Sequence, residues 1–464
     1  MKGNHPTVLF FFLLAFAGQM SAQSSTLPSY IQEALENNIA LQQKNLSYQR
    51  SLEALKEAKA MFIPKLSLEA RYSMAQGGRT IEFPVGDLVN PAYENLNLIN
   101  GLASDANPSY PNIPTYPTIE NESINFLRTR EQETKFRAAM PLFNAAIIQN
   151  QRIQANLSES ERIGVEVYRR ELVKEVKTAY YNYAKAVQAV SLYENTMLLV
   201  QENLRTSESL HRNHKVTIDE VYAAQAQVKE VEQSLTVAQK NEKIARSYFN
   251  FLLNQEFDRE ITLDEITIDP VIVTDRAQLI NMAKAKREEI QQMNYFLAAT
   301  DNKIKLSKGN MLPQINLAVD YGVQGRDYNL DADSDYVMGS LVMSWNLFDR
   351  SNKPKVQQAK IERQELAQRK LEVQQQIGLQ TISAFHEVEA AIKQVELTET
   401  QVRALKEAYK LVAKKYAIGQ ANQVELTNAR TQMTNAEQQS IIAQFDYQIR
   451  IAELERAAGS YVFD

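Results

Sequence analysis

The sequence predicts a mostly α-helical protein made of two similar halves, whose four strands contribute to a transmembrane β-barrel shared between chains. Long stretches without proline carry apolar residues at every seventh position, as in Val190, Met197 and Leu204, which is typical of coiled-coil helices. A helix–proline–strand segment occurs twice, at residues 56–72 and 305–321. The segments predicted as strands alternate apolar and polar side chains, so each strand has one apolar face.

An internal duplication organises the chain. KEAKAMFIPKLSLEARY at residues 56–72 aligns with KLSKGNMLPQINLAVDY 249 positions later, and FRAAMPLFN at residues 136–144 aligns with LVMSWNLFD 205 positions later. Offsets that hold over long spans indicate a repeated structural unit. The 44 positions by which the two offsets differ are extra loop in the first copy. We therefore predict a signal peptide at residues 1–22, a first repeat at residues 23–274 and a second repeat at residues 275–464.

The N-terminus has the features of a secretory signal peptide. Lys2 precedes an apolar run at Val8–Ala17, and a small-residue site ends at Ala22. A run of about ten apolar residues is too short to span a bilayer as a helix. The alternative interpretation of this segment is a buried first helix.

Composition excludes several classes of protein. The chain has no cysteine, so it can form neither disulfides nor a lipid-modified N-terminal cysteine. Its formal charge of −5 is spread along the chain without the basic block that a nucleic-acid partner requires. No stretch after the signal approaches the roughly 18 apolar residues of a transmembrane helix. The mature protein is therefore either soluble or inserted in a membrane only through strands.

The first repeat is predicted to begin with a helix at Ser29–Met61, which Pro64 ends. The segment at 75–131 is rich in Asn, Pro, Gly and Tyr and is predicted as a long loop. The remaining elements predicted for this repeat are strands at 65–74 and 133–143, helices at Ala145–Arg212 and Glu220–Leu253, and a small β segment at Phe257–Thr274.

The second repeat follows the same plan. Its predicted elements are a helix at Arg276–Met311, strands at 314–324 and 336–348, a long helix at Lys353–Ile418 and a return helix after the turn GQANQ. The 68-residue helix of the first repeat is about 100 Å long, and its 34-residue return helix only about 50 Å. Two short helices stacked end to end would match one long helix. Each half is thus expected to be a pair of antiparallel rods, one continuous and one broken.

The four strands have about the ten residues that cross a bilayer when tilted. Four strands cannot close a barrel, and an open edge in lipid leaves backbone groups unpaired. A membrane barrel must therefore be shared, with eight strands from two chains or twelve from three. The alternative, a soluble sheet, would need another surface to cover Leu341, Met343, Trp345 and Leu347. The side chains predicted to face the water-filled lumen are Glu69, Arg71, Lys135, Arg137 and Asp320.

These features resemble the TolC family of outer-membrane efflux proteins. The signal peptide, the duplicated helix–Pro–strand units, the strand ends PLFN and NLFD and the two helical hairpins occur in the family's order. The resemblance implies a homotrimer with a shared 12-stranded barrel in outer-membrane lipid and a helical tunnel across the periplasm. It also implies that the tunnel docks onto a periplasmic adaptor protein and an inner-membrane transporter.

The resemblance further implies functional residues at the two hairpin turns. Gly419 and Glu425 match the family's pattern of a glycine followed by an acidic residue whose three copies ring the tunnel entrance, while Asn428 fills a second acidic position. Glu220 takes the corresponding place in the first hairpin. A ring of carboxylates in a narrow lumen favours cations. The alternative interpretation of Glu425 is a solvated residue at a helix start, stabilised by the helix dipole. The residues implied in tip closure or adaptor docking are Tyr416, Gly419, Gln420, Ala421, Lys215, Val216, Thr217 and Asp219.

The function implied is a passive exit duct for small molecules, driven by a partner pump. The same duct would suit type I protein secretion, and a protein of another class, a non-conducting periplasmic coiled-coil scaffold, would share the helices but not the apolar strands. No nucleophile motif, phosphate loop or pair of catalytic carboxylates is present, so we expect no enzyme activity and no cofactor. His211 and His214 have metal-ligand spacing but no third ligand nearby, so no metal site is expected.

Overall fold

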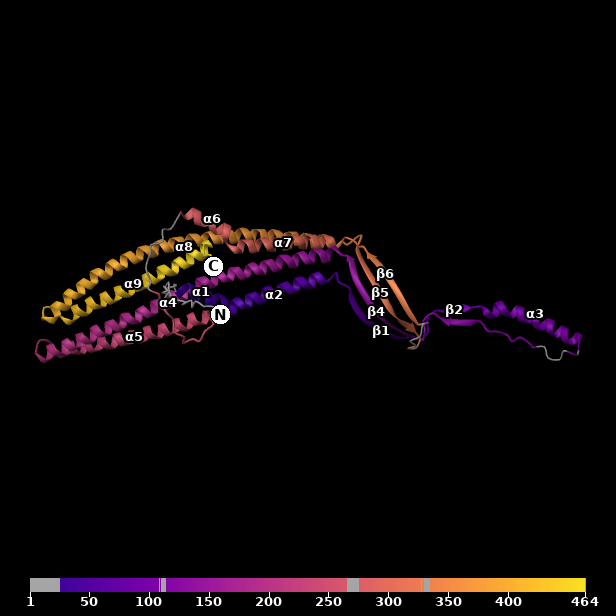
Figure 1. The fold of residues 1–464 in the computed structure, drawn as a ribbon, viewed down its shortest axis with the longest axis horizontal. Coiled ribbons are helices and arrows are strands. Elements are labelled where there is room, and N and C mark those ends of the chain that lie inside the picture. Colours follow the sequence, from indigo (N-terminus) through magenta and orange to yellow (C-terminus); the bar gives the residue numbers. More distant parts are fainter. Residues whose placement is uncertain are drawn as a thin grey trace, which may run out of the picture. The chain divides into compact units, whose positions relative to one another are not determined.

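A computed structural model describes residues 26–107, 109, 114–264, 275–326, 328 and 334–463 (Figure 1). The predicted signal peptide at 1–22 lies outside the described residues. The chain forms two compact units. The helical unit contains the described residues of 26–55, 153–301 and 360–463, and the strand unit contains those of 56–152 and 302–359.

The helices of the two halves are related by the offsets seen in the sequence. The first half contains α1 (Thr26–Asn37), α2 (Ile39–Ala60), α4 (Ala145–Arg212) and α5 (Ile218–Leu252); the second contains α6 (Arg276–Lys286), α7 (Glu288–Gly309), α8 (Asn352–Ala417) and α9 (Gln423–Ala458). An offset of 249 carries α2 onto α7, and an offset of 205 carries the end of α4 and the start of α5 onto the end of α8 and the start of α9. Helices long and apolar enough to cross a membrane are not found in the described parts of the chain.

The prediction of two unbroken helices, at Ser29–Met61 and Arg276–Met311, was wrong. Each is interrupted by one residue, Asn38 between α1 and α2 and Arg287 between α6 and α7, and these residues are 249 positions apart. Asn38 Nδ2 donates to the carbonyl of Leu252 at 2.9 Å, and Arg287 Nη1 donates to the carbonyl of Ala457 at 3.3 Å. Carbonyl groups at a helix end have no partner within the helix. The side chain at each break therefore supplies a hydrogen bond to a carbonyl at the end of a return helix, α5 or α9. We call these two places junctions: at the first, the end of α5 meets the break between α1 and α2, and at the second, the end of α9 meets the break between α6 and α7.

The hydrophobic core of the helical unit surrounds the first junction. The rings of Tyr30 and Phe249 meet edge to face at 5.2 Å, and Tyr180 lies 5.9 Å from Phe249. The backbone N–H groups of Thr262 and Asp264 donate to the hydroxyls of Tyr30 and Tyr180. Residues 257–264 contain no strand, and two of their N–H groups bond to these tyrosines instead of to a neighbouring strand. The small β segment predicted at Phe257–Thr274 is thus wrong for 257–264, and residues 265–274 lie outside the described part of the chain.

The strand unit contains an antiparallel sheet in the order β1 (Lys65–Met74), β4 (Arg130–Phe143), β5 (Gln314–Gly325) and β6 (Asp335–Ser344). The second strand starts at Arg130, earlier than the predicted 133. The last strand was predicted to reach 348 but ends at Ser344, whose ladder partner is Gln314. Pro313 precedes Gln314 and has no N–H to continue the ladder, and the Trp345 indole instead donates to the carbonyl of Met311.

The predicted loop at 75–131 was wrong for most of its length. It contains the short hairpin of β2 (Thr80–Phe83) and β3 (Glu122–Asn125) and a helix, α3 (Val85–Ala106) (Figure 1). Clusters of asparagine, proline and glycine are typical of loops. In the structure, asparagine side chains of α3 instead hydrogen-bond the backbone of the segment that returns to β3.

Candidate channel-lining sites

The two hairpin turns have the same backbone geometry. The N–H of His214 donates to the carbonyl of His211 and that of Lys215 to Leu210; in the second turn, Gly419 and Gln420 make the equivalent bonds. This is the Schellman arrangement, in which one residue adopts the left-handed conformation that favours glycine. Gly419 has φ +76° and meets this requirement, whereas His214 takes the same position with φ +60°.

This comparison predicts opposite effects of two substitutions. His214→Gly is expected to stabilise the first hairpin by about 1 kcal/mol, because it removes the steric cost of a left-handed side chain. Gly419→Ala is expected to destabilise the second hairpin by about the same amount. Thermal unfolding of the two variants, followed by circular dichroism, checks both signs. A stabilising Gly419→Ala would contradict this account of the turns.

Tyr416 joins the two hairpins just before the second turn. Its side chain is 2% exposed, and its hydroxyl lies 2.9 Å from Ser207 Oγ of α4 and 3.5 Å from Glu220 Oε2 of α5. Burial raises the pKa of Tyr416, so the hydroxyl keeps its proton at neutral pH. Gln227 of α5 and Thr427 of α9 make a second hydrogen bond between the hairpins. Glu220, predicted in the constriction, therefore lies beside Tyr416.

Glu425 lies in the first turn of α9. Asn422 is the N-cap of this helix, and its side-chain oxygen accepts from the Glu425 N–H at 2.9 Å. The Asn422 amide also donates to Glu425 Oε1 at 3.2 Å, so the two side chains hold each other. Glu425 and Asn428 are both exposed and, being three positions apart on one helix, share a face. Thr217, at the matching position of the first hairpin, makes no side-chain cap.

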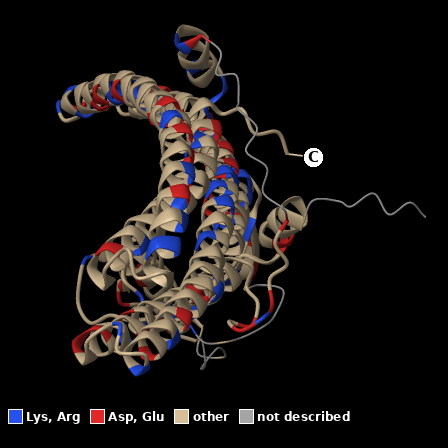
Figure 2. Cartoon of the chain, turned by 90° about the vertical axis from the view of Figure 1, so that its left-hand side faces the viewer, with Lys and Arg blue, Asp and Glu red and all other residues tan. Residues whose placement is uncertain are grey.

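The other residues of the turns are mostly open to solvent. Lys215, Thr217, Asp219, Gly419 and Gln420 are exposed, and Val216 and Ala421 are half-buried. Acidic and basic side chains are interspersed along the described helices (Figure 2).

The side chain of His211 is part of the first hairpin turn. The ring nitrogen Nδ1 of His211 lies 3.1 Å from the carbonyl of Val216 and so stabilises the turn. In the described part of the chain, no cluster of three or more His, Cys, Asp or Glu side chains is placed to hold a metal ion.

The five side chains predicted to line the lumen share one face of the sheet. Glu69 pairs in register with Lys135, and Arg137 with Asp320. Asp320 is 1% exposed and receives two hydrogen bonds from Arg137, of 2.8 and 2.7 Å. Glu69 lies 3.3 Å from Arg137, and Arg71 lies 3.3 Å from Glu133. Positive and negative side chains thus alternate across this face as a connected network.

Gly322 makes room for this network. A Cβ atom at this position would lie 2.5 Å from the Cβ of Lys135 and 2.4 Å from the carbonyl oxygen of Thr134. Because real Cβ atoms do not approach so closely, only glycine lets β4 and β5 pack with Lys135 directed across the face.

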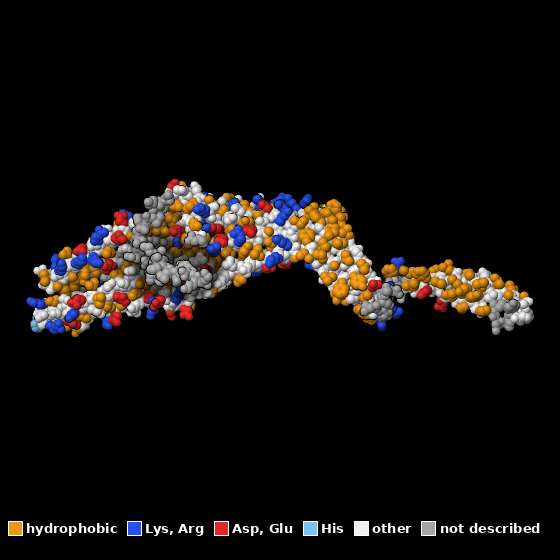
Figure 3. All heavy atoms as spheres, viewed as in Figure 1, with side chains coloured by type: hydrophobic (Ala, Val, Ile, Leu, Met, Phe, Trp, Pro, Cys, Tyr) orange, Lys and Arg blue, Asp and Glu red, His pale blue; other side chains and the backbone are white. Residues whose placement is uncertain are grey.

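The opposite face of the sheet is apolar and exposed. Leu66 is 74% exposed and Leu341 is 68% exposed. Hydrophobic side chains cover the sheet in Figure 3. The apolar side chains of 37% exposure or more on this face and the segments that end its strands are Leu66, Leu68, Tyr72, Met74, Phe136, Leu142, Phe143, Val319, Tyr321, Val337, Leu341, Met343, Trp345, Leu347 and Phe348, while Met338 and Val342 lie in register with Asp320 and Asn316 on the charged face.

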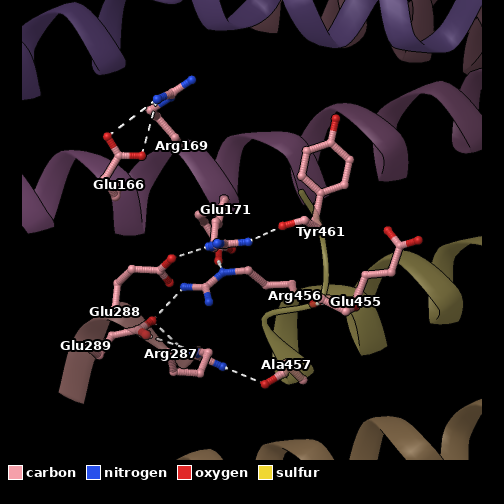
Figure 4. A network of polar contacts seen from close by, with 12 residues as sticks. Glu166, Arg169, Glu171, Arg287, Glu288, Glu289, Glu455, Arg456, Ala457 and Tyr461 are labelled. Carbon is pink, nitrogen blue, oxygen red and sulfur yellow. Dashed lines mark hydrogen bonds and ion pairs between the residues drawn. The ribbon is translucent and has the colours of Figure 1, made fainter. Parts of the chain in front are cut away.

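A charged network at the second junction was missed by sequence reasoning. Arg456 of α9 contacts Glu171 of α4 at 3.0 Å and Glu289 of α7 at 2.7 Å (Figure 4). Arg287 also donates two hydrogen bonds to Glu289. Burial raises the pKa of Glu289, but the hydrogen bonds from Arg287 and the charge of Arg456 outweigh it and lower this pKa to about 2. The residues lie up to 285 positions apart, so no local pattern could have shown this network.

Comparison with known proteins identifies the class. Residues 279–460 match the family model described as outer membrane efflux protein. The chain is 20% identical over 457 residues to the outer membrane protein TolC of Escherichia coli (strain K12), an alignment that covers 95% of this chain and 83% of TolC.

Solved structures agree on the fold. A membrane protein from Pseudomonas aeruginosa matches with a TM-score of 0.74 at 16% identity, over 94% of each chain. The outer membrane protein VceC of Vibrio cholerae matches with a TM-score of 0.72 at 14% identity, over 94% of this chain and 96% of VceC.

Long helical hairpins joined to strands with one charged and one apolar face are the fold that the chain shares with outer-membrane proteins such as VceC and TolC, which are not enzymes. Residues 279–460 thus resemble the outer membrane efflux protein family, and the chain as a whole is similar to TolC. The protein is located in the outer membrane, with its helical part in the periplasm.

Proposed function

We propose that three copies of this chain form a passive exit duct through the outer membrane. Four strands from each copy would close a 12-stranded barrel, and the hairpins would form a tunnel that receives small molecules from an inner-membrane transporter through a periplasmic adaptor. One observation carries this proposal: the sheet has a charged face, an exposed apolar face, and β1 and β6 as edges with no further partner among the described strands.

Each feature of the sheet has a physical consequence. An exposed apolar face is stable in lipid and unstable in water. The charged face would cost several kcal/mol per residue in lipid and therefore requires a water-filled lumen. Unpaired edges in lipid leave backbone groups without partners, so β1 of one copy would pair with β6 of the next. A non-conducting periplasmic scaffold would need none of these features.

The assembly is tested by imaging the detergent-extracted protein in the electron microscope. We expect a hollow tube with three-fold symmetry, whose helical part is about 100 Å long. Extraction should require detergent, because the apolar face contacts lipid. A rod without a lumen, released by salt alone, would refute the duct and the shared barrel together.

The hairpin tips are the proposed constriction. In a trimer, Glu425 and Asn428 would present one carboxylate and one amide from each chain to the lumen, with Glu220 held beside Tyr416. The exposed residues of both turns, Lys215 to Asp219 and Gly419 to Ala421, would then form the surface that the adaptor contacts. Glu69, Arg71, Lys135, Arg137 and Asp320 would line the barrel, where their mixed signs favour neither cations nor anions.

Glu425→Gln tests the constriction with little change in shape, because glutamine can keep the contact with Asn422. If three carboxylates ring the entrance, the cation-to-anion permeability ratio in planar bilayers is expected to fall by a factor on the order of ten. Glu407→Gln is the matched control, since it removes a solvent-exposed carboxylate paired with Lys410. Equal ratios for Glu425→Gln and the unmodified channel would exclude Glu425 from the constriction.

A further inference from the structure

The helix α3, inserted only in the first copy, carries an exposed apolar stripe. Leu88 is 76% exposed, Ile99 is 60% exposed and Leu102 is 66% exposed. The stripe repeats every seven residues: Leu88, Asn95 and Leu102 form one row, and Ala92, Ile99 and Ala106 form the other. Hydrophobic side chains are visible along this helix in Figure 3. Two apolar rows with a seven-residue period are the pattern of a coiled-coil seam.

The opposite side of α3 is already occupied by the chain itself. Asn90 and Asn97 each make two hydrogen bonds of 2.8–2.9 Å to the backbone of the returning segment, at Ile119 and Tyr116 respectively. The ring of Tyr93 stacks on that of Tyr116 at 4.9 Å. On a helix, residues seven apart lie on the same face, so Asn90 and Asn97 fix this face against the returning segment. The apolar stripe lies on the other side of the helix.

The chain path places α3 at the end of the sheet away from the helices. Met74, at the end of β1, pairs with Arg130 at the start of β4, so residues 75–129 close this end of the strand pair. The periplasmic helices α2 and α4 join the opposite ends of the same strands. In the proposed duct this end faces the cell exterior. Because β1 is an edge strand, α3 is also attached next to the boundary with a neighbouring copy.

The charge of α3 disfavours a membrane surface as the partner of the stripe. The helix contains Asp87, Glu94 and Asp105 and neither lysine nor arginine. Helices that lie on anionic lipid carry basic residues on their polar face. A polar residue such as Asn95 within an apolar seam is instead a common means of fixing the register of packed helices.

We propose that the three copies of α3 pack against one another through this stripe and form a helical collar around the outer exit of the duct. A free helix of this length would associate weakly. Attachment to one barrel raises the effective concentration of the three helices, so a short seam suffices. The collar rests on the proposed trimer, and it adds an interaction surface that the second copy of the repeat lacks.

Disulfide crosslinking tests the collar directly, because the chain contains no cysteine. Ile99→Cys, in the middle of the stripe, is oxidised in the detergent-extracted full-length protein and separated without reductant. We expect a crosslinked pair of chains, at least about tenfold more abundant than with Glu94→Cys, since a stripe position is close to its symmetry mate while Glu94 lies away from the stripe. Leu102→Cys repeats the test one helical turn further along.

Light scattering on the same sample separates the possible failures. A trimer in which Ile99→Cys and Leu102→Cys crosslink no more than Glu94→Cys would overturn the collar and leave the duct intact. Crosslinks in intact cells to a protein of another mass would overturn it in favour of a different surface partner. A monomeric particle would refute the collar together with the proposed duct.

Discussion

Arg456→Met is expected to lower the free energy of unfolding by about 3–5 kcal/mol, the usual cost of removing one partner from a buried ion pair. Arg456 is shared by Glu171 and Glu289, and its side chain is 10% exposed. Its loss leaves Glu171 and Glu289 without the cation that they share, and only Arg287 still contacts Glu289 among the residues of this network. Methionine keeps most of the side-chain volume, so the measured loss would reflect charge rather than a cavity. Thermal unfolding of the detergent-extracted protein measures the effect.

The pH dependence of this loss identifies its cause. Glu289 has a pKa of about 2 in the folded protein, below its ordinary value of 4.5. The charged form therefore contributes stability above pH 4.5, about 3 kcal/mol at most, and this contribution disappears as the pH falls towards 2. Arg456→Met removes the part of that contribution that comes from the charge and hydrogen bond of Arg456, so the difference from the unmodified protein should be largest at neutral pH and shrink below pH 4.5. A difference that does not change with pH would point to packing instead.

Arg450→Met is the matched control on the same helix. Arg450 pairs with Glu387 and Glu453, but its side chain is 40% exposed. Surface pairs of this kind contribute about 0–1 kcal/mol. If both variants lost the same stability, the junction network would have no special role. The double variant Arg456→Met with Glu289→Gln should recover part of the loss, since it removes one of the two carboxylates that Arg456 neutralises.

The repeat in the sequence predicted the layout of the helices because a duplication preserves the spacing of elements. The long helix predicted at Ala145–Arg212 has those bounds in the structure, and the start of α9 at Gln423 lies 205 positions after the start of α5. The charged face of the sheet was also predictable, since side chains alternate strictly along a strand.

The features that were missed depend on contacts between distant residues. The apolar spacing of the first helix continues through Asn38, so only its bond to Leu252 reveals the break. The helix α3 was missed because its asparagines, which are typical of loops, bond to backbone that lies 19–29 positions away. The contact of Tyr416 with Glu220 spans 196 positions and could not be read from either turn alone. Local sequence patterns thus predict helices and strands, whereas the contacts between these elements depend on residues that are distant in sequence.

Tyr416→Ala is expected to separate the two hairpins and raise the conductance of the channel. The substitution removes a large side chain that is 2% exposed, together with its contacts to Ser207 and Glu220. Truncation of a buried aromatic ring costs about 3–5 kcal/mol. The hydrogen bond between Gln227 and Thr427 would still join the two hairpins. Single-channel recording in planar bilayers measures the change.

Two further variants show which part of Tyr416 acts. Tyr416→Phe keeps the ring and removes only the hydroxyl, so we expect a smaller change, with a cost of about 1 kcal/mol. His211→Ala alters the position that matches Tyr416 in the first hairpin, where the side chain hydrogen-bonds its own turn at Val216. It should therefore leave the conductance close to that of the unmodified channel. If His211→Ala and Tyr416→Ala raised the conductance equally, the effect would come from loosening either turn, and the contact between the hairpins would not hold the tip closed.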